Sequence, residues 1–193
     1  MKDINSGSIR SFEDMIREAG SIVITTHMKP DGDAIGSSTA MLFFLMKTCG
    51  KAEAKVVLND DCPRYLTFIK DAIPAESLIT RDGNIEKAKE TIDSSDLIIC
   101  LDFNAFHRTG GLEASLSESK ARKILIDHHL DPSEDFDLMI SYPEASSTCY
   151  LVALLIEQMW GEEYISREMA ENIFVGMMTD TGNFAFSSVT PDV

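Results

Sequence analysis

The stretch SIVITTHMKPDGDAIGSSTAMLFFLMKTCG, residues 21–50, sets the fold that we expect for this chain. Its first part, residues 21–27, is a continuous and largely β-branched run, which predicts a buried strand. Pro30 and Gly32 end that run. Its last part, residues 34–49, is rich in small and then apolar side chains and stops before a glycine, which predicts a helix buried on most of its faces. A strand, a loop and a helix in this order form the first unit of a parallel α/β sheet.

The rest of the chain repeats this alternation of strand and helix. Repeated units of this kind connect by right-handed crossovers, so the expected fold class is α/β, with a mainly parallel sheet and helices on both faces. No internal repeat or linker divides the sequence, and residues 1–193 are expected to form a single domain. Further strands are predicted at AKVVL (54–58), DLIICLD (96–102) and RKILIDHH (122–129). Helices are predicted at residues 9–16, 63–69, 85–92, 112–119, 146–161 and 166–182.

Composition narrows the class of protein. With 44% hydrophobic and 25% charged residues the chain is typical of soluble globular proteins. Its net charge of −15 argues against binding to long nucleic acid, because such binding requires basic side chains that neutralise phosphates. The longest strongly apolar stretch, residues 40–46, is too short to span a membrane, and the N-terminus lacks a signal-peptide core. No C-x-x-C pair occurs, so free thiols in a reducing cytoplasm are expected at Cys49, Cys62, Cys100 and Cys149.

Acids and histidines follow three of the predicted strands. In an open parallel sheet, ligands bind beyond the carboxyl ends of the strands, so these side chains are expected to meet at one edge. A further acid, Asp180, ends an apolar helix, where a carboxylate is unfavourable against the helix dipole unless a cation compensates it. The residues at strand ends are His27, Asp31 and Asp33 after the first strand, Asp102 after the third, and Asp127, His128 and His129 after the fourth.

Taken singly, these residues have simpler interpretations. An Asp- and Gly-rich loop is often only a turn, and Asp102 would also serve as a helix cap. Adjacent side chains on a strand point to opposite faces, so His128 and His129 need not share a role. Gly36 and Ser37, near the start of a helix, offer backbone N–H groups to a phosphate, although neither G-x-x-x-x-G-K nor G-x-G-x-x-G is present. The fourth histidine, His107, is expected at the surface.

Taken together, the candidates exceed what one zinc ion needs, since a catalytic zinc takes three protein ligands. Four carboxylates and two imidazoles suit two divalent ions of the Mn or Mg kind, a pair that can activate water and bind the oxygens of a phosphate. The candidate metal ligands are His27, Asp31, Asp33, Asp102, His128 and Asp180.

Four segments resemble, in order, the signature motifs of the DHH phosphoesterases. They are THMKPDGDAIGS (26–37), LDFN (101–104), DHH (127–129) and GMMTDTGNF (176–184). Within that family the chain looks most similar to the bacterial nanoRNase and pAp phosphatase branch. Those enzymes degrade very short oligoribonucleotides and remove the 3′-phosphate of 3′-phosphoadenosine 5′-phosphate (pAp), typically with Mn²⁺. The resemblance also implies a Rossmann-like sheet.

Carried over by position, the resemblance assigns roles to the candidates. It implies that His27 and Asp31 hold one metal, that Asp33, His128 and Asp180 hold the other, and that Asp102 bridges them. His129 would face the scissile phosphate, with Asp127 orienting a neighbouring ligand, so that His129, Asp102 and Asp127 form the catalytic set. Arg108 matches a frequent family arginine, with a structural and a phosphate-binding role left open, and Ser37 is a further candidate for substrate contact. Tyr150 stands where relatives usually carry a Glu.

The expected protein is therefore a cytoplasmic phosphoesterase domain acting on a small nucleotide or a very short oligonucleotide. We expect two divalent ions (Mn²⁺, with Mg²⁺ as the alternative), no long nucleic acid, no membrane and a possible homodimer. The C-terminal substrate-binding domain of the DHHA1 type, which carries a Gly-rich motif in the family, is expected to be absent from residues 1–193. Alternatives within the family are a cyclic-dinucleotide phosphodiesterase, an exopolyphosphatase and a family II pyrophosphatase. A non-catalytic, metal-binding regulatory domain is the alternative from another class.

Overall fold

Within residues 3–186 and 189, the part of the chain that this computed structural model describes, six strands form one sheet in the order β3-β2-β1-β4-β5-β6. Every neighbouring pair is parallel. The predicted α/β class is thus confirmed. The strands are β1 (Ile22–Thr25), β2 (Lys55–Leu58), β3 (Leu78–Thr80), β4 (Leu97–Leu101), β5 (Arg122–Asp127) and β6 (Leu138–Ser141).

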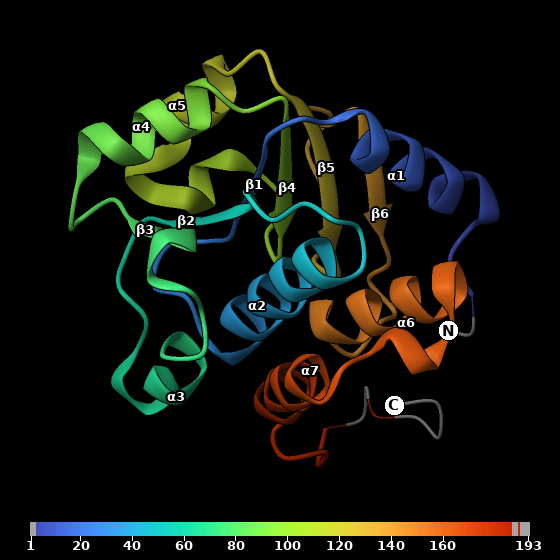
Figure 1. Ribbon diagram of the computed structural model, residues 1–193. Coiled ribbons are helices and arrows are strands. Elements are labelled where there is room, and N and C mark those ends of the chain that lie inside the picture. The colour runs from blue at the N-terminus through green and yellow to red at the C-terminus, as the bar shows by residue number, and fades with distance from the viewer. Residues whose placement is uncertain (1–2, 187–188, 190–193) are drawn as a thin grey trace.

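The strand order places a crevice between β1 and β4. The chain builds outward from β1 in one direction through β2 and β3, and then returns to the other side of β1 with β4, β5 and β6 (Figure 1). Where the order reverses, the connections leave the sheet on opposite faces and open a crevice beyond the carboxyl ends of the two central strands. The loops that follow β1 and β4, which carry His27 and Asp102, therefore lie at this point.

Helices cover both faces of the sheet (Figure 1). The strand residues Ile24 and Ile99 belong to a core shared with α1 (Ser6–Glu18), α2 (Gly32–Lys47) and α6 (Thr148–Trp160), whereas Val23 and Ile98 belong to a core shared with α4 (Ile85–Asp93) and α5 (Glu113–Glu118). A further helix, α7 (Arg167–Asp180), packs on α2 and α6. The short elements are η1 (Arg64–Leu66), α3 (Thr67–Lys70), η2 (Ala75–Ser77), η3 (Phe106–Leu112) and η4 (Glu162–Tyr164).

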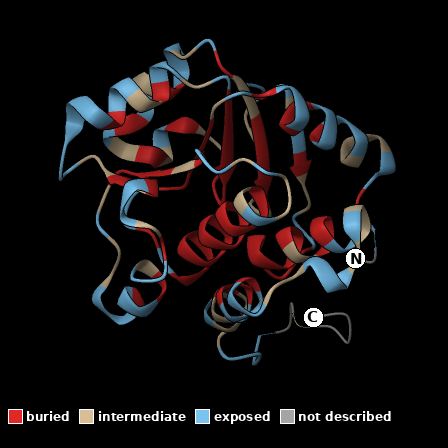
Figure 2. Cartoon of the chain, in the orientation of Figure 1, coloured by how far each residue is buried: buried red, intermediate tan, exposed pale blue. Residues whose placement is uncertain are grey.

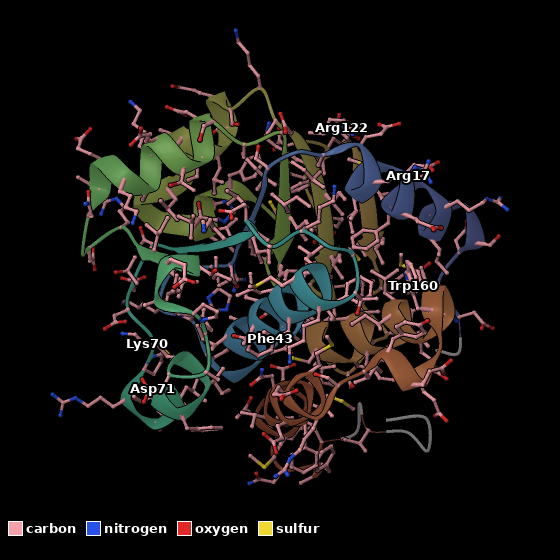
Figure 3. The ribbon with its side chains drawn as sticks, viewed as in Figure 1. Arg17, Phe43, Lys70, Asp71, Arg122 and Trp160 are labelled. Carbon is pink, nitrogen blue, oxygen red and sulfur yellow. The ribbon has the colours of Figure 1, made fainter. Side chains whose placement is uncertain are left out.

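Helix α2 is the most completely buried helix of the fold, as Figure 2 shows by its colour. Its residues 32–45 are all buried, because the sheet covers one side and α7 the other. The two helices approach closely at Gly36, where an added Cβ would lie 2.5 Å from the carbonyl oxygen of Asn172. The predicted buried helix is thus confirmed. At its last residue, the Lys47 ammonium lies 5.1 Å from the ring centroid of Phe43, a residue that Figure 3 labels.

Two strands were not predicted from the sequence. Strands β3 and β6 are the edges of the sheet, each three or four residues long and each only partly buried, so neither shows a long apolar run. The strands that were predicted are shorter than expected: β1 ends at Thr25 and β5 at Asp127. His27, His128 and His129 consequently lie in loops beyond the strands. Strand alternation therefore does not apply to His128 and His129, because neither residue belongs to β5.

The predicted helices are present, with shifted bounds. The segment predicted at 63–69 is the 3-10 turn η1 followed by the single turn α3, and the segment at 112–119 becomes the end of η3 followed by α5. The four cysteines are free, with Cys100 and Cys149 buried. In the described part of the chain, no helix combines the length and the apolar character that crossing a membrane requires.

Candidate active site and metal centre

The predicted acids and histidines converge on the crevice beyond β1, β4 and β5. Two groups of three have their ligand atoms within 4.8 Å of one another. We call them the first cluster (His27, Asp31 and Asp102) and the second cluster (Asp33, His128 and Asp180). A third grouping of Asp102, His128 and His129 connects them. All six residues predicted as metal ligands thus lie together, although they come from four separate segments of the chain.

The local backbone explains how each acid reaches the crevice. Asp102 follows β4 with a φ of 66°, a left-handed conformation that is uncommon for a residue with a side chain and that Asp tolerates better than most. It does not cap a helix, because η3 begins four residues later with Ala105 as its N-cap. Asp31 caps α2, and its Oδ1 accepts hydrogen bonds from the amides of Asp33 (3.0 Å) and Ala34 (3.1 Å).

The carboxylate of Asp102 faces both clusters with different oxygens. Its Oδ2 lies 3.5 Å from Nε2 of His27, in the first cluster. Its Oδ1 lies 3.6 Å from Nε2 of His128, in the second cluster. The Nε2 atom of His128 also lies 3.8 Å from Oδ2 of Asp33 and 3.5 Å from Oδ2 of Asp180. One fully buried carboxylate therefore stands between two sets of donors.

Both histidines present an unprotonated Nε2 to these carboxylates when they are neutral. Nδ1 of His27 lies 2.8 Å from the carbonyl oxygen of Met28, and Nδ1 of His128 lies 3.3 Å from that of Ala145. Because a carbonyl oxygen only accepts, each Nδ1 carries the hydrogen and donates it. A backbone partner at the far nitrogen is the arrangement that orients metal-binding histidines in proteins.

The charges of the site are poorly balanced by the protein alone. The pKa of Asp33 is raised well above its usual range, first by burial and then by the negative charge of Asp102. The pKa of Asp180 is also raised, mainly by burial. Burial lowers the pKa of His128, but the neighbouring carboxylate of Asp102 outweighs it and raises that pKa to about 9. The pKa of Asp102 is lowered, because the two histidines outweigh its burial.

Divalent cations fit this donor set. The Nε2–oxygen separations of 3.5 to 3.9 Å are too long for good hydrogen bonds, yet two ligands of a single ion lie at about such distances when each is roughly 2.1 Å from it. Imidazoles and carboxylates suit Mn²⁺ and related ions, and positive charge would remove the repulsion that raises the pKa of Asp33. The residues present therefore have the chemistry of a divalent-cation site.

The start of α6 holds two of the acids, and this was not predicted from the sequence. The amides of Thr148 and Cys149 donate to the two oxygens of Asp33 at 2.6 and 2.8 Å. The Thr148 hydroxyl donates to Oδ1 of Asp102 at 2.9 Å. The Ser-Ser-Thr run at the start of the predicted helix was the available signal, because such residues favour helix N-termini.

Asp127 and His129 form a separate pair beside the clusters. Nδ1 of His129 lies 2.7 Å from Oδ1 of Asp127, and the carboxylate is fully buried at the end of β5. The His129 side chain remains 30% exposed. Rings of His128 and His129 meet edge to face at 5.0 Å, which places both histidines at the same edge of the sheet.

Four other residues singled out from the sequence lie elsewhere or differ from expectation. Ser37 is fully buried and donates to the carbonyl oxygen of Ala34, so its hydroxyl does not face the crevice. Because α2 begins at Gly32, the amide of Gly36 serves the helix itself and is not free for a phosphate, which corrects that expectation. His107 is exposed, as predicted. Tyr150 is buried in the core, and its amide donates to Oγ of Ser147, the N-cap of α6, at 3.0 Å.

Arg108 lies in η3, next to the loop that follows β1. Its carbonyl oxygen accepts the amide of Met28 at 2.8 Å, which ties the two segments together. The side chain is partly buried, and its guanidinium has no hydrogen bond or ion pair with any residue of 3–186.

A cavity of about 260 Å³ lies away from the predicted site. It is lined by Arg17, Cys49 and Trp160, of which Figure 3 labels Arg17 and Trp160, and none of the predicted site residues lines it.

Comparison with known families assigns the chain to a family. A family model described as "DHH family, N-terminal domain" matches residues 21–177. The chain therefore belongs to the DHH family of phosphoesterases, and the resemblance carried by its four motifs is confirmed.

Individual relatives extend this result. The bifunctional oligoribonuclease and PAP phosphatase NrnA of Thermus thermophilus is 32% identical over 90% of this chain and 47% of its own length. The cyclic-di-AMP phosphodiesterase PdeA of Listeria monocytogenes is 24% identical over 91% of this chain and 27% of its own length. The crystal structure of an exopolyphosphatase-related protein from Bacteroides fragilis superposes with a TM-score of 0.90 at 38% identity, covering 100% of this chain and 55% of that one. The chain spans about half the length of the NrnA relative.

Proposed function

We propose that this domain hydrolyses phosphate esters of very short oligoribonucleotides and the 3′-phosphate of pAp, with two divalent cations, Mn²⁺ first. The observation that carries the proposal is the position of Asp102, with one oxygen toward His27 and the other toward His128. A buried acid between two sets of donors is what a shared ligand of two cations requires. Two cations bound there would polarise the phosphate and activate a water molecule for in-line attack.

The remaining side chains of the crevice have roles that follow from their contacts. Asp127 holds Nδ1 of His129, and the His129 side chain is 30% exposed, so Nε2 of the doubly protonated ring is proposed to donate a hydrogen bond to the phosphate. The guanidinium of Arg108 is proposed to bind a phosphate oxygen, which would make use of a charge that has no partner in the described part of the chain.

The choice of substrate draws on the relatives. The Thermus thermophilus relative bears the name of an oligoribonuclease and PAP phosphatase, at the higher identity of the two named enzymes. The net charge of −15 is consistent with a small substrate, since a long polyanion would be repelled. A cyclic dinucleotide is the second candidate, because the Listeria monocytogenes phosphodiesterase covers as much of this chain.

Titration with Mn²⁺ tests the cation pair. Isothermal titration calorimetry on the 193-residue chain should give two equivalents of Mn²⁺, and Asp102→Ala should weaken both. Asp135→Ala, which removes an exposed acid outside the crevice, is the matched control and should leave both unchanged. A single equivalent in the wild type would refute the two-cation site.

Hydrolysis assays then separate the substrates. Release of phosphate from pAp and of mononucleotides from a dinucleotide, both lost in Asp102→Ala, would support the first candidate. Turnover of cyclic-di-AMP alone would replace it with the second. Turnover of polyphosphate or pyrophosphate alone would overturn both.

A further inference from the structure

Thr148, the first residue of α6, contacts two acids that belong to different parts of the proposed cation site. Its amide donates to Oδ2 of Asp33 at 2.6 Å, and its hydroxyl donates to Oδ1 of Asp102 at 2.9 Å. The residue is fully buried, so water does not compete for either bond. Neither contact is repeated by another described side chain, and together they connect the helix N-terminus to both carboxylates.

Among the described residues, the Thr148 hydroxyl is closer to the Asp102 carboxylate, at 2.9 Å, than the Nε2 atoms of His27 and His128, at 3.5 and 3.6 Å. Asp33 receives two amides, from Thr148 and Cys149, and is held by the backbone of α6. Asp102 receives no amide, and apart from the histidines its hydrogen-bond partner is the Thr148 hydroxyl.

The orientation of this carboxylate determines which oxygen serves which cluster. Oδ1 lies toward His128 and Oδ2 toward His27. A hydrogen bond to Oδ1 engages one lone pair of that oxygen and fixes the plane of the group about the Cβ–Cγ bond. The other lone pair of Oδ1 then remains for the second cluster, and Oδ2 remains wholly for the first.

We propose that Thr148 is a positioning residue that fixes the carboxylate of Asp102 so that each oxygen serves one of the two clusters. The inference rests on the two-cation part of the proposed function. Thr148 itself touches neither cation nor substrate in this account. It acts through Asp102, and the loss of its hydroxyl leaves the bridging acid free to rotate.

The test compares three variants of the 193-residue chain. Thr148→Val removes the hydroxyl and keeps the shape, whereas Thr148→Ser keeps the hydroxyl and removes the methyl group. Thr109→Val is the matched control, because the buried Thr109 hydroxyl donates only to the carbonyl oxygen of Phe106 at 2.6 Å. Each variant is titrated with Mn²⁺ by calorimetry, and its unfolding is measured in EDTA.

In the wild type and in Thr148→Ser, two Mn²⁺ ions should bind with equal affinities in the two proteins. In Thr148→Val, at least one ion should bind about 10- to 100-fold more weakly, the usual effect of losing a partner that orients a metal ligand. Thr109→Val should lower the unfolding temperature in EDTA and leave the affinities unchanged.

Three results would overturn the inference. The first is a Thr148→Val variant that binds both ions as tightly as the wild type does. The second is a Thr148→Ser variant that loses an ion. The third is a Thr109→Val variant that weakens binding as much as Thr148→Val does. Should Thr148→Val not fold, the loss of an ion in Thr148→Ser would still overturn the inference. A wild type that binds fewer than two ions would refute the proposed function instead, so the two failures are distinguishable.

Discussion

Gly176 is expected to control the second cluster through its contact with Cys149. An added Cβ at Gly176 would lie 2.2 Å from Sγ of Cys149 and 3.0 Å from Oδ1 of Asp33, so Gly176→Ala forces α7 away from α6 and α2. Over-packing of a tight core costs about 1–3 kcal/mol. For a chain of this size that corresponds to a fall of about 2–12 °C in unfolding temperature.

The same substitution should reach the metal centre. Asp180 lies one helical turn after Gly176, and its Oδ2 is 3.5 Å from Nε2 of His128. A shift of α7 therefore separates these two atoms, and one of the two Mn²⁺ ions should bind about 10-fold or more weakly. Calorimetry with Mn²⁺ and thermal unfolding in EDTA measure the two effects separately.

A double-mutant cycle identifies the cause. Cys149→Ala removes the Sγ that Gly176→Ala would meet, so the double variant should recover most of the stability and affinity, with a coupling of about 0.5–3 kcal/mol. Cys62→Ala, at a cysteine away from this contact, should be additive with Gly176→Ala. Additive effects for Cys149 and Gly176 would refute the reasoning.

Three further predictions concern cations, protons and substrate. Mn²⁺ at 100 times its dissociation constant should stabilise the chain by about 2.7 kcal/mol, seen as a rise of about 5–11 °C in unfolding temperature that EDTA reverses; no rise would contradict a cation site. The pKa of His128 is raised to about 9, so in EDTA its protonated form should stabilise the fold fully below pH 6.5. This contribution, at most about 3 kcal/mol, should be lost as the pH rises through 9. Urea unfolding between pH 6.5 and 10 should show this loss in the wild type and in His107→Gln but not in His128→Gln, and an equal loss in His128→Gln would assign it to another group. Arg108→Ala should raise KM for pAp by roughly 10- to 100-fold, as expected for the loss of a hydrogen bond between charged groups. Ser37→Ala is the control and should leave KM unchanged, because the Ser37 hydroxyl is buried. Equal KM values in the two variants would show that Arg108 does not bind the substrate.

The sequence by itself determined the class of fold and the chemical types at the site. Continuous apolar strands, such as residues 97–101, are recognisable because a strand covered on both faces must be apolar throughout. Acids directly after such strands, Asp102 among them, are recognisable as candidates for one edge because parallel strands end together. The four motifs named the family before any contact was known, and the family model confirmed it.

The tertiary structure alone decided how those residues are arranged. That β4 returns to lie beside β1, and so brings Asp102 to His27, depends on strand pairing between distant segments, which no local pattern encodes. The edge strands β3 and β6 are short and partly exposed, so they show no apolar run in the sequence. Only their hydrogen bonds to one neighbouring strand each identify them as strands. Thr148 donates hydrogen bonds to Asp33, 115 positions away in the chain, and to Asp102, 46 positions away. Only packing of α6 against the crevice makes those contacts, since hydrogen bonds at this range are set by the fold and not by neighbouring residues.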